Sequence, residues 1–403
     1  MRIMAPIGAV AVAVVTLQCG LLGSPGEYAT GGETTLDAAS VETSSPNDAT
    51  TQPEVVVLPD GNVVPQSIGT LALMAGERQP TSPEDDPAWS ADAWSGILAS
   101  DGRVATWRIE KSAALVGSFD SAGLIGNKWV MINVGFGLFG GRGTAIQSTS
   151  WAPGIVGDWR ANRATGNPGG LDEPTRAFFG AHLAYVGGTR TEPGVDGGPA
   201  TTTFTKEAHI SDVDVAMNQL GASADSGQQL VVARSRSAVL HAGASLYVVA
   251  GRGPAGLTAS VEMAPVDVAA GTIAAFVEQP LLMNAGAEHK IYGASLAVAE
   301  GYLFVAGGRN AANAPGVVVL SAKIGAGGTL GPFQNVTALP KPLRDFAFVA
   351  FKGKIYVAGG IGATTRSDEV FSATIGPDGK LGTWDSSNAK LPGPRSDFVA
   401  LAY

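Results

Sequence analysis

The sequence predicts an all-β protein in which six four-stranded antiparallel sheets close into a ring. Three observations lead to this prediction: a glycine-rich and weakly charged composition, a recurring hexapeptide, and a second recurring pattern in the same register. Among the 403 residues there are 55 Gly, and 15% of the residues are charged. Helical bundles carry more charge on their exposed faces, whereas short strands joined by tight turns consume glycine.

The N-terminal residues predict export. Arg2 precedes an apolar run over Ile3–Leu17, which is typical of a signal peptide covering residues 1–18. This run is shorter than the roughly twenty residues that a membrane-spanning helix needs. Cys19, the only cysteine in the sequence, follows directly. Its placement resembles a bacterial lipoprotein signal, which implies a lipidated Cys19 and an outer-membrane or cell-surface location. Plain secretion, or release into the periplasm, is the alternative.

The next segment predicts a tether. Residues 20–52 are rich in Gly, Ser, Thr, Asp and Glu and have almost no apolar periodicity. Such a composition does not supply enough apolar surface to pack. We therefore expect a flexible tether over residues 19–62 and one folded domain over residues 63–403.

A hexapeptide recurs through this domain. It reads Gly, any residue, Val/Ile/Leu, Gly/Ala, any residue, Trp/Phe. The copies are Gly102–Trp107, Gly154–Trp159, Gly271–Phe276, Gly328–Phe333 and Gly379–Trp384, with a degenerate copy at Asn218–Ser223. Repeats at a fixed period indicate an architecture of stacked units. The spacing predicts six units of about 51 to 64 residues.

A second pattern appears at the same period, an apolar run that ends in small residues. Its clearest copies are Leu246–Gly251, Leu303–Gly308 and Ile355–Gly360. Each unit reads as four strands. In the last complete unit, for example, strands are expected over residues 345–351, 354–360, 368–375 and 380–384, separated by Gly and Asp turns. A four-stranded sheet has two faces to bury, and radial stacking of six sheets buries both.

The C-terminal sequence predicts how the ring closes. Leu391–Arg395 followed by Asp397–Tyr403 repeats the opening of the previous unit, Leu339–Phe351, and then stops. The first unit begins near Ile68 and lacks an opening strand. We therefore expect the last strand to complete the first sheet. A pair of β-sandwiches or a β-helix is the alternative architecture, but rungs of a β-helix are shorter and sandwiches do not repeat a hexapeptide.

Strands that end in Gly-Gly, an aromatic residue near the end of each unit and Leu-Pro-x-Pro connectors resemble kelch-repeat proteins, in the form common in bacterial envelopes. The resemblance covers roughly residues 63–403 and implies a six-bladed β-propeller of four-stranded blades. Kelch-type propellers include binding proteins and carbohydrate-active enzymes. The resemblance therefore leaves two classes of function open.

The sequence contains no convincing motif for a cofactor or a metal. Gly135–Gly140 and Gly251–Gly256 match the dinucleotide fingerprint, but neither opens a helix. The four histidines show no metal-ligand spacing. They are His182, His209, His241 and His289. We expect no cofactor and no metal. The net charge of −9 also gives no general attraction to nucleic acid or to anionic lipid.

One constellation of arginines predicts a binding surface. In a meander sheet the first strand starts where the second strand ends, so residues at these points meet on one rim. Arg142, Arg190, Arg252 and Arg309 follow the second strands, and Arg176, Arg234, Arg344 and Arg395 precede the first strands. Guanidinium groups hold carboxylates and sulfates bidentately, which favours an acidic glycan or protein ligand. The alternative is that each arginine pairs with a nearby acid and only joins adjacent sheets.

The function expected from these residues is that of an exported binding or scaffolding protein which contacts the membrane only through an N-terminal lipid. The alternative is a carbohydrate-active enzyme of the epimerase or lyase kind. Such an enzyme needs an arginine and an acid at the central opening, and the sequence places no acid there.

Overall fold

The computed structural model describes residues 14–15, 56–57, 63–64, 68–74, 76–78, 90–113, 118–125, 128–135, 143–152, 155–164, 170–192, 200–397 and 399–402. The predictions for Cys19, for the segment 20–52 and for Arg142 lie outside these residues. The described chain is all-β and propeller-like, and its sheets are antiparallel. In this part of the chain no helix is long and apolar enough to cross a membrane.

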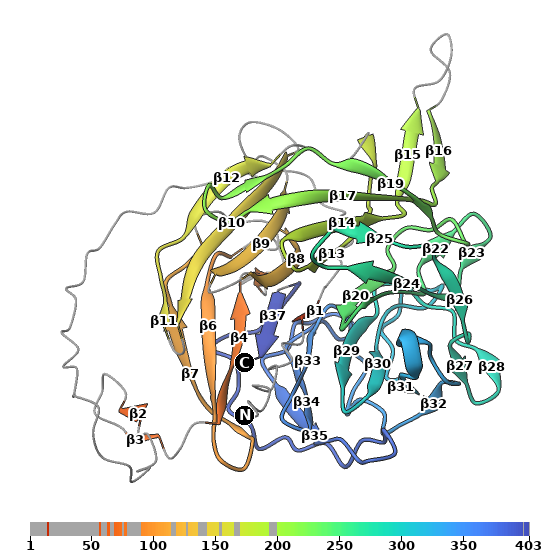
Figure 1. The fold of residues 1–403 in the computed structure, drawn as a ribbon. Helices are drawn as coiled ribbons and strands as arrows, with labels where there is room; N and C mark the ends of the chain where they lie inside the picture. Colours follow the sequence, from red (N-terminus) through yellow and green to blue (C-terminus); the bar gives the residue numbers. More distant parts are fainter. Residues whose placement is uncertain are drawn as a thin grey trace, which may run out of the picture.

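Six sheets of three to five strands follow one another in chain order (Figure 1). Sheet 1 contains β4 (Gly69–Met74), β6 (Ala93–Leu98), β7 (Val104–Glu110), β37 (Val399–Ala402) and β1 (Val14–Val15). Sheet 2 contains β8 (Ser118–Ile125), β9 (Lys128–Gly135), β10 (Gly143–Ala152), β11 (Ile155–Val156) and β12 (Arg160–Ala164). Sheet 3 contains β13 (Thr175–Phe179), β14 (His182–Val186), β17 (Glu207–Asp214), β18 (Gln219–Leu220) and β19 (Ala224–Gln229).

The other three sheets belong to the C-terminal half. Sheet 4 contains β20 (Ala238–Ala242), β21 (Ser245–Val249), β24 (Val261–Asp267), β25 (Thr272–Ile273) and β26 (Val277–Gln279). Sheet 5 contains β29 (Ser295–Ala299), β30 (Tyr302–Ala306), β31 (Val319–Lys323) and β32 (Gln334–Asn335). Sheet 6 contains β33 (Ala347–Phe351), β34 (Lys354–Ala358) and β35 (Val370–Thr374).

Short two-stranded elements lie in the connections. They are β2 (Val56–Val57) with β3 (Val63–Val64), β5 (Glu77–Arg78) with β36 (Arg395–Ser396), β15 (Thr189–Glu192) with β16 (Thr201–Phe204), β22 (Arg252–Gly253) with β23 (Gly256–Leu257), and β27 (Met283–Asn284) with β28 (Ala287–Glu288). A 3-10 turn, η4, covers Ala326–Gly328.

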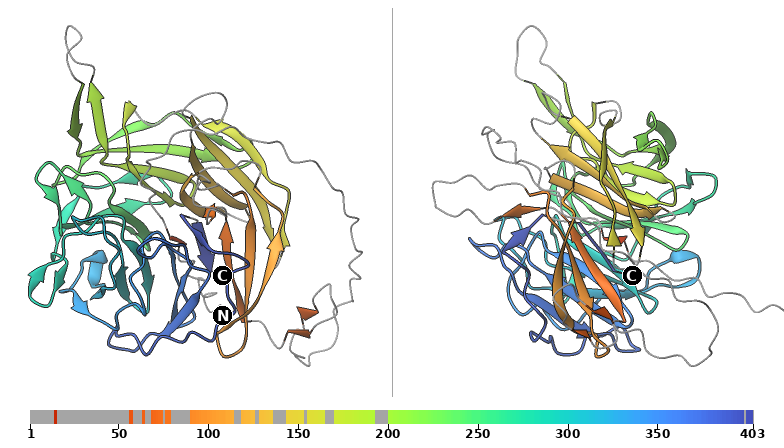
Figure 2. Two further views of the ribbon diagram at one scale, coloured as in Figure 1. Left: turned by 180° about the vertical axis from the view of Figure 1, so that it is seen from behind. Right: turned by 90° about the vertical axis from the view of Figure 1, so that its left-hand side faces the viewer.

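The C-terminal strand pairs with the first unit, as the sequence predicts. β37 lies antiparallel beside β4, with Val399 opposite Met74 and Leu401 opposite Ala72. β1 lies along the other edge of β37, with Val14 opposite Leu401. The views in Figures 1 and 2 both place β37 next to β4. Sheet 1 is therefore built from both ends of the described chain.

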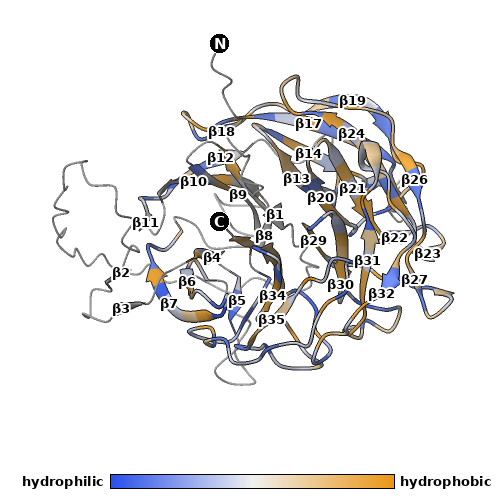
Figure 3. Ribbon diagram, turned by 60° about the horizontal axis from the view of Figure 1, so that its bottom comes forward, coloured by the Kyte–Doolittle hydropathy of each residue, from blue (hydrophilic) through white to orange (hydrophobic). Residues whose placement is uncertain are grey.

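The strand that opens each sheet contacts the strand that opens the next sheet. In sheet 1 this position is held by the C-terminal strand β37. These contacts join β37 to β8, β8 to β13, β13 to β20, β20 to β29, β29 to β33, and β33 back to β37. The strands β13, β21 and β30 are buried at every residue, as expected for sheets covered on both faces. Figure 3 shows many hydrophobic residues in the strands and hydrophilic ones in many of the connections.

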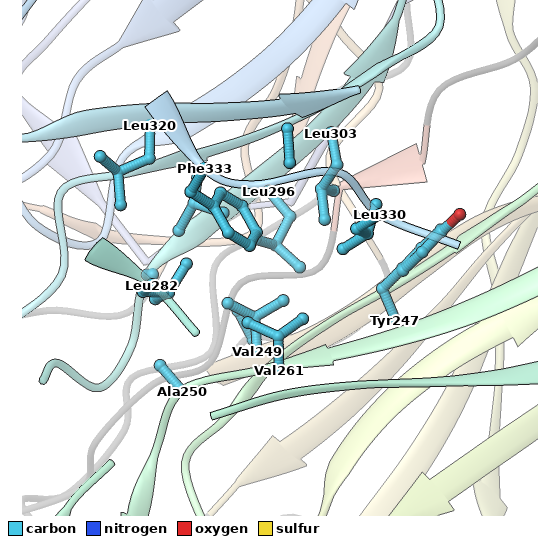
Figure 4. Close-up of a cluster of buried hydrophobic side chains, with 14 of the residues drawn as sticks. Tyr247, Val249, Ala250, Val261, Leu282, Leu296, Leu303, Leu320, Leu330 and Phe333 are labelled. Atoms are coloured by element: carbon cyan, nitrogen blue, oxygen red, sulfur yellow. The ribbon is translucent and has the colours of Figure 1, made fainter. Parts of the chain in front are cut away.

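The core is divided among the gaps between consecutive sheets. One cluster, drawn in Figure 4, combines Tyr247, Val249 and Val261 of sheet 4 with Leu296 and Leu303 of sheet 5. Another joins Val349 and Tyr356 of sheet 6 to Leu71 and Leu98 of sheet 1. Because each gap buries the apolar faces of two sheets, neither sheet face is left in water.

The recurring hexapeptide begins with a turn that is hydrogen-bonded to the preceding sheet. Its first glycine has a positive φ, 77° at Gly102 and 82° at Gly328, which is why this position is glycine. A tyrosine of the preceding sheet donates a hydrogen bond to the turn: Tyr247 to the Gly328 carbonyl at 2.8 Å and Tyr356 to the Gly102 carbonyl at 2.7 Å. The tyrosine hydroxyl thus satisfies a turn carbonyl.

The recurring tryptophans hold the connectors between units. The Nε1–H of Trp384 donates to the Ala338 carbonyl at 2.7 Å, and that of Trp159 donates to the Lys111 carbonyl at 3.0 Å. Trp107 donates to the Ala389 carbonyl at 2.9 Å, a residue of the connector that leads into β37. The indole ring packs against the sheets while its N–H reaches the backbone.

The outer strand of the last unit differs from the expectation. Residues 380–384 form no continuous strand, and isolated bridges join Ile375 to Leu381 and Ser372 to Asp385 instead. Gly382 donates to the Thr374 carbonyl at 2.9 Å, so part of the pairing is retained. Between the two bridges the outer segment advances four residues, from Leu381 to Asp385, while the facing segment, from Ser372 in β35 to Ile375, advances three. This one-residue shift in register interrupts the outer strand.

Candidate functional site

The residues before the first strands and after the second strands lie at one end of the sheets, as the arginine prediction requires. Backbone bridges join Ser235 to Arg252, Tyr292 to Arg309 and Arg344 to Ile361. Arg395 pairs with Arg78 in the same way. We call this end of the sheets the arginine rim.

Gly-Gly pairs make this end compact. Gly359 and Gly360 have φ values of 62° and 93°. A Cβ on Gly360 would lie 2.9 Å from the Arg344 carbonyl oxygen. Gly360 also donates to the Arg395 carbonyl of the next sheet at 2.8 Å. Glycine permits both this close contact with the Arg344 carbonyl and these positive φ angles. The backbones of adjacent sheets can therefore form hydrogen bonds at the arginine rim.

Arg234 does not face the solvent. Its side chain is 0% exposed and forms an ion pair with the equally buried Glu262. Its Nη1 donates to the Ser260 carbonyl at 2.9 Å, and Glu262 accepts hydrogen bonds from the backbone N–H groups of Val231 and Val232. Burial lowers the pKa of Arg234. This arginine joins β24 to the loop before β20, which is the structural alternative stated above.

Arg176 and Arg395 are buried too. The guanidinium of Arg176 lies 5.4 Å from the centre of the Tyr185 ring, and burial lowers its pKa to about 10. The guanidinium of Arg395 lies 4.3 Å from the Trp94 ring and donates to Asp92 at 2.8 Å. Burial lowers the pKa of Arg395, against the attraction of Asp92. Both side chains pack in the interior of the rim.

Arg190 belongs to a half-buried cluster with Glu207 and His209. Its Nε donates to Glu207 at 3.0 Å and its Nη2 at 2.5 Å, while His209 Nε2 lies 2.8 Å from the same carboxylate. The hydrogen bond from Arg190 lowers the pKa of Glu207, although burial acts in the opposite direction. The Glu207 carboxylate therefore already has Arg190 and His209 as partners.

Arg309 and Arg344 share one carboxylate. Both donate to Asp345 Oδ2, and the Asp345 side chain is 1% exposed. Burial opposes the charged form of Arg309, but the attraction of Asp345 outweighs it and raises the pKa of this guanidinium. The Nε of Arg309 and the Oδ1 of Asp345 have no hydrogen-bond partner among the described residues.

Arg252 differs from the other arginines of the rim. It is exposed, and no carboxylate of the described chain lies within ion-pair distance of it. Its guanidinium carbon lies 5.6 Å from the centre of the Tyr292 ring, and that of Arg309 also lies 5.6 Å from it. Tyr292 is held in place because its hydroxyl donates to Asn313 at 2.5 Å.

Two residues of this surface were missed by the sequence analysis. Arg236 pairs bidentately with Glu173 across two sheets, and the hydrogen bond raises the pKa of Arg236. Tyr292 lies between Arg252 and Arg309. The signal for Arg236 was its position, two residues before β20, which matches that of Asp345 before β33. We call Arg236, Arg252, Tyr292, Arg309 and Arg344 the cationic patch.

No group of three or more His, Cys, Asp or Glu side chains that could hold a metal ion occurs among the residues with described positions. His182 Nδ1 lies 2.8 Å from Asp212, which is an isolated pair. The second dinucleotide-like segment, Gly251–Gly256, forms the β22–β23 hairpin. Of the first, only Gly135 at the end of β9 is described.

Comparison with known proteins supports the fold alone. No family model matches this sequence, and no curated protein matches it. A solved structure described as "Structure of YjhT" is similar, with a TM-score of 0.51 and 14% sequence identity, over 71% of this chain and 88% of that chain. At that identity the similarity concerns the path of the backbone.

Proposed function

We propose that the sheets form a closed six-bladed propeller of the kelch type. The support is that β37 contacts both β33 and β8, and that a core cluster joins sheet 6 to sheet 1. Deleting residues 398–403 tests closure, because it removes β37 and bares one edge of β4. The expected result is loss of cooperative thermal unfolding. A truncated chain with an unchanged melting temperature would contradict closure.

We propose further that the protein is exported and tethered at an envelope by Cys19. This proposal depends on Ile3–Leu17 and on the position of Cys19 in the sequence. Processing at Cys19 would remove residues 1–18 and with them β1, leaving β37, β4, β6 and β7 in sheet 1. Mass spectrometry of the protein purified from membranes tests it. A diacylglyceryl group on Cys19 is expected, whereas an unmodified chain recovered from the medium would favour plain secretion.

The proposed activity is recognition of an acidic glycan at the cationic patch. The observation that carries it is the pair of guanidiniums, Arg252 and Arg309, on one tyrosine ring. The patch holds four arginines, and two paired carboxylates, Glu173 and Asp345, balance only part of their charge. Guanidiniums bind carboxylates strongly, and Arg252 is the exposed member of the pair, whereas Arg309 and Tyr292 are each 8% exposed.

The test is an Arg252→Gln variant. Arg252 is exposed and lacks an ion pair, so its replacement leaves the fold intact. Binding to polygalacturonate is expected to weaken at least tenfold. The matched control is Arg103→Gln, an exposed arginine at the turn between β6 and β7, paired with Asp101. Equal binding by wild type and both variants would contradict the proposal, and binding to acidic peptides alone would favour a protein partner.

A carbohydrate-active enzyme remains the second candidate. Asp345 supplies an acid beside the arginines, but its carboxylate is held by two guanidiniums, and a general acid or base must exchange protons with its substrate. The same binding experiment distinguishes the two, because an enzyme converts the oligosaccharide during incubation. We favour the binding protein, for which the recovered glycan is unchanged.

A further inference from the structure

Equivalent positions recur along the arginine rim from sheet to sheet. Two residues before β13, β20, β29, β33 and β37 lie Glu173, Arg236, Gly293, Asp345 and Asp397, respectively; the matching position before β8 is outside the described residues. All five have φ values between 50° and 61°. Backbone hydrogen bonds join neighbouring members, from Gly293 N–H to the Arg236 carbonyl at 3.2 Å and from Asp397 N–H to the Asp345 carbonyl at 3.0 Å. We call these residues the pre-strand positions.

A second set of equivalent positions follows the glycine that closes each second strand. Arg252 follows Gly251 in sheet 4, and Arg309 follows Gly308 in sheet 5. Both make the same backbone bridge to the residue before a pre-strand position, Arg252 to Ser235 and Arg309 to Tyr292. The two arginines therefore occupy the same place in consecutive sheets.

The equivalence breaks at one point. Between sheets 5 and 6, Arg309 forms its ion pair with Asp345, the pre-strand residue of the next sheet. Between sheets 4 and 5, Arg252 is the counterpart of Arg309, and the counterpart of Asp345 is Gly293. Glycine has no carboxylate, which explains why Arg252 lacks the ion pair that Arg309 has.

The space for a carboxylate is present at Gly293. A Cβ built on Gly293 meets no described atom within 4 Å, whereas one built on the nearby Gly307 would lie 2.8 Å from the Leu343 carbonyl oxygen. The φ of 61° at Gly293 matches the 55° of Asp345, so glycine is not required there by the backbone. Gly293 is buried, and its N–H donates to the Arg236 carbonyl at 3.2 Å. It directly follows Tyr292, whose ring lies 5.6 Å from the guanidinium carbons of both Arg252 and Arg309.

We propose that the carboxylate of a sugar acid binds at Gly293 and takes the place that the Asp345 side chain holds in the next sheet. The exposed Arg252 is its principal partner, and the buried Tyr292 ring lies 5.6 Å from the Arg252 guanidinium. This inference rests on the proposed function, because it assigns the acidic group of that ligand to one position. It also predicts discrimination, since a neutral sugar of the same shape leaves Arg252 unpaired.

The experiment introduces a carboxylate at position 293 by substitution. Gly293→Asp places a carboxylate where the ligand carboxylate is proposed to bind, and Asp tolerates this region of φ. Gly293→Asn is the matched control, with the same shape and no charge. Each is made in the full chain, alone and with Arg252→Gln. Thermal unfolding and binding of D-glucuronate, with glucose as the neutral probe, are measured for every variant.

The expected results are specific. Wild type binds glucuronate and not glucose. Gly293→Asp weakens glucuronate binding at least tenfold, and Gly293→Asn weakens it much less. Gly293→Asp melts at a higher temperature than Gly293→Asn, and this difference disappears when Arg252→Gln is present.

Two outcomes would overturn the inference in distinguishable ways. If wild type binds glucuronate or polygalacturonate and Gly293→Asp binds equally well, the ligand carboxylate lies elsewhere, and the proposed function survives. If wild type binds neither acidic probe, the proposed function fails and this inference fails with it, whatever the melting temperatures are.

Discussion

Tyr356 and Gly102 lie 254 positions apart in the sequence, yet the Tyr356 hydroxyl donates a 2.7 Å hydrogen bond to the Gly102 carbonyl. The bond joins sheet 6 to sheet 1. It has the same form as the bond from Tyr247 to Gly328 between sheets 4 and 5. The junction that unites the two ends of the described chain therefore uses the same contact as a junction inside it.

Tyr356→Phe is expected to destabilise the protein by about 1–2 kcal/mol, because it leaves a buried carbonyl without its donor. Burial raises the pKa of Tyr356, so the hydroxyl stays protonated as a donor. Urea unfolding measures the change. Tyr302→Phe is the control, since its bond to the Pro377 carbonyl is longer, at 3.3 Å, and only partly buried. Equal midpoints for wild type and Tyr356→Phe would show that the bond adds no stability.

Gly360→Ala is expected to cost more than about 2 kcal/mol. Its φ of 93° disfavours any L side chain, and the new Cβ would lie 2.7 Å from the Cβ of Phe346. The control is Gly243→Ala in the β20–β21 turn, which has a φ of 61° and no described atom within 4 Å of the new Cβ. That change costs only the left-handed penalty of about 1 kcal/mol. Chemical denaturation of both variants makes the comparison, and the reverse order of stability would refute it.

Glu262→Gln is expected to destabilise the fold by about 3–5 kcal/mol, since it leaves the buried Arg234 guanidinium without a counter-charge. Glu288→Gln is the matched control, because Glu288 is exposed on β28, pairs with Lys290 and lies in another element, and its loss is expected to change stability by less than about 0.5 kcal/mol. Guanidinium unfolding curves give both values. A small effect at Glu262 would mean that water reaches Arg234.

The pH dependence of stability is expected to include His241. Burial lowers its pKa below the ordinary 6.5, and its ring lies beside that of Phe179, with centroids 6.1 Å apart. The unfolded chain therefore binds the proton first as the pH falls. Stability is expected to be level above pH 6.5 and to decline as the pH falls from 6.5 through the folded pKa of His241.

His241→Leu tests this prediction by removing the titrating group. Melting temperatures between pH 5 and pH 8 are expected to fall less steeply on the acid side than those of wild type. Part of the slope persists, because burial also lowers the pKa of His289. Identical slopes for wild type and His241→Leu would assign the acid sensitivity to other groups.

The sequence alone predicted the local elements well where glycine and apolar residues set them. The runs ending at Gly251, Gly308 and Gly360 are second strands, and the turn glycines Gly102 and Gly379 have positive φ, as their backbone freedom suggests. The outer strand after Gly379 was predicted as continuous, but a one-residue shift in register between the Ile375–Leu381 and Ser372–Asp385 bridges interrupts it.

The candidate site was predicted less completely. The positions of the arginines at one end of the sheets followed from strand order, but their partners did not. Arg234 is buried with Glu262 and Arg309 with Asp345, whereas Arg252 is exposed. Tyr292 and Arg236 carried no motif of their own. Their role emerges only beside Arg252 and Glu173, which belong to other sheets.

By itself the sequence determined the repeated unit, its strand order and the end of the sheets at which the arginines collect. These features depend on short apolar runs and turn glycines, whose effect on the backbone is local. The tertiary structure decided which arginines are paired with a carboxylate and which one, Arg252, is exposed without an ion pair among the described residues. An ion pair such as Arg309 with Asp345 spans 36 positions and two sheets. Its existence depends on how adjacent units are juxtaposed, which no single repeat contains.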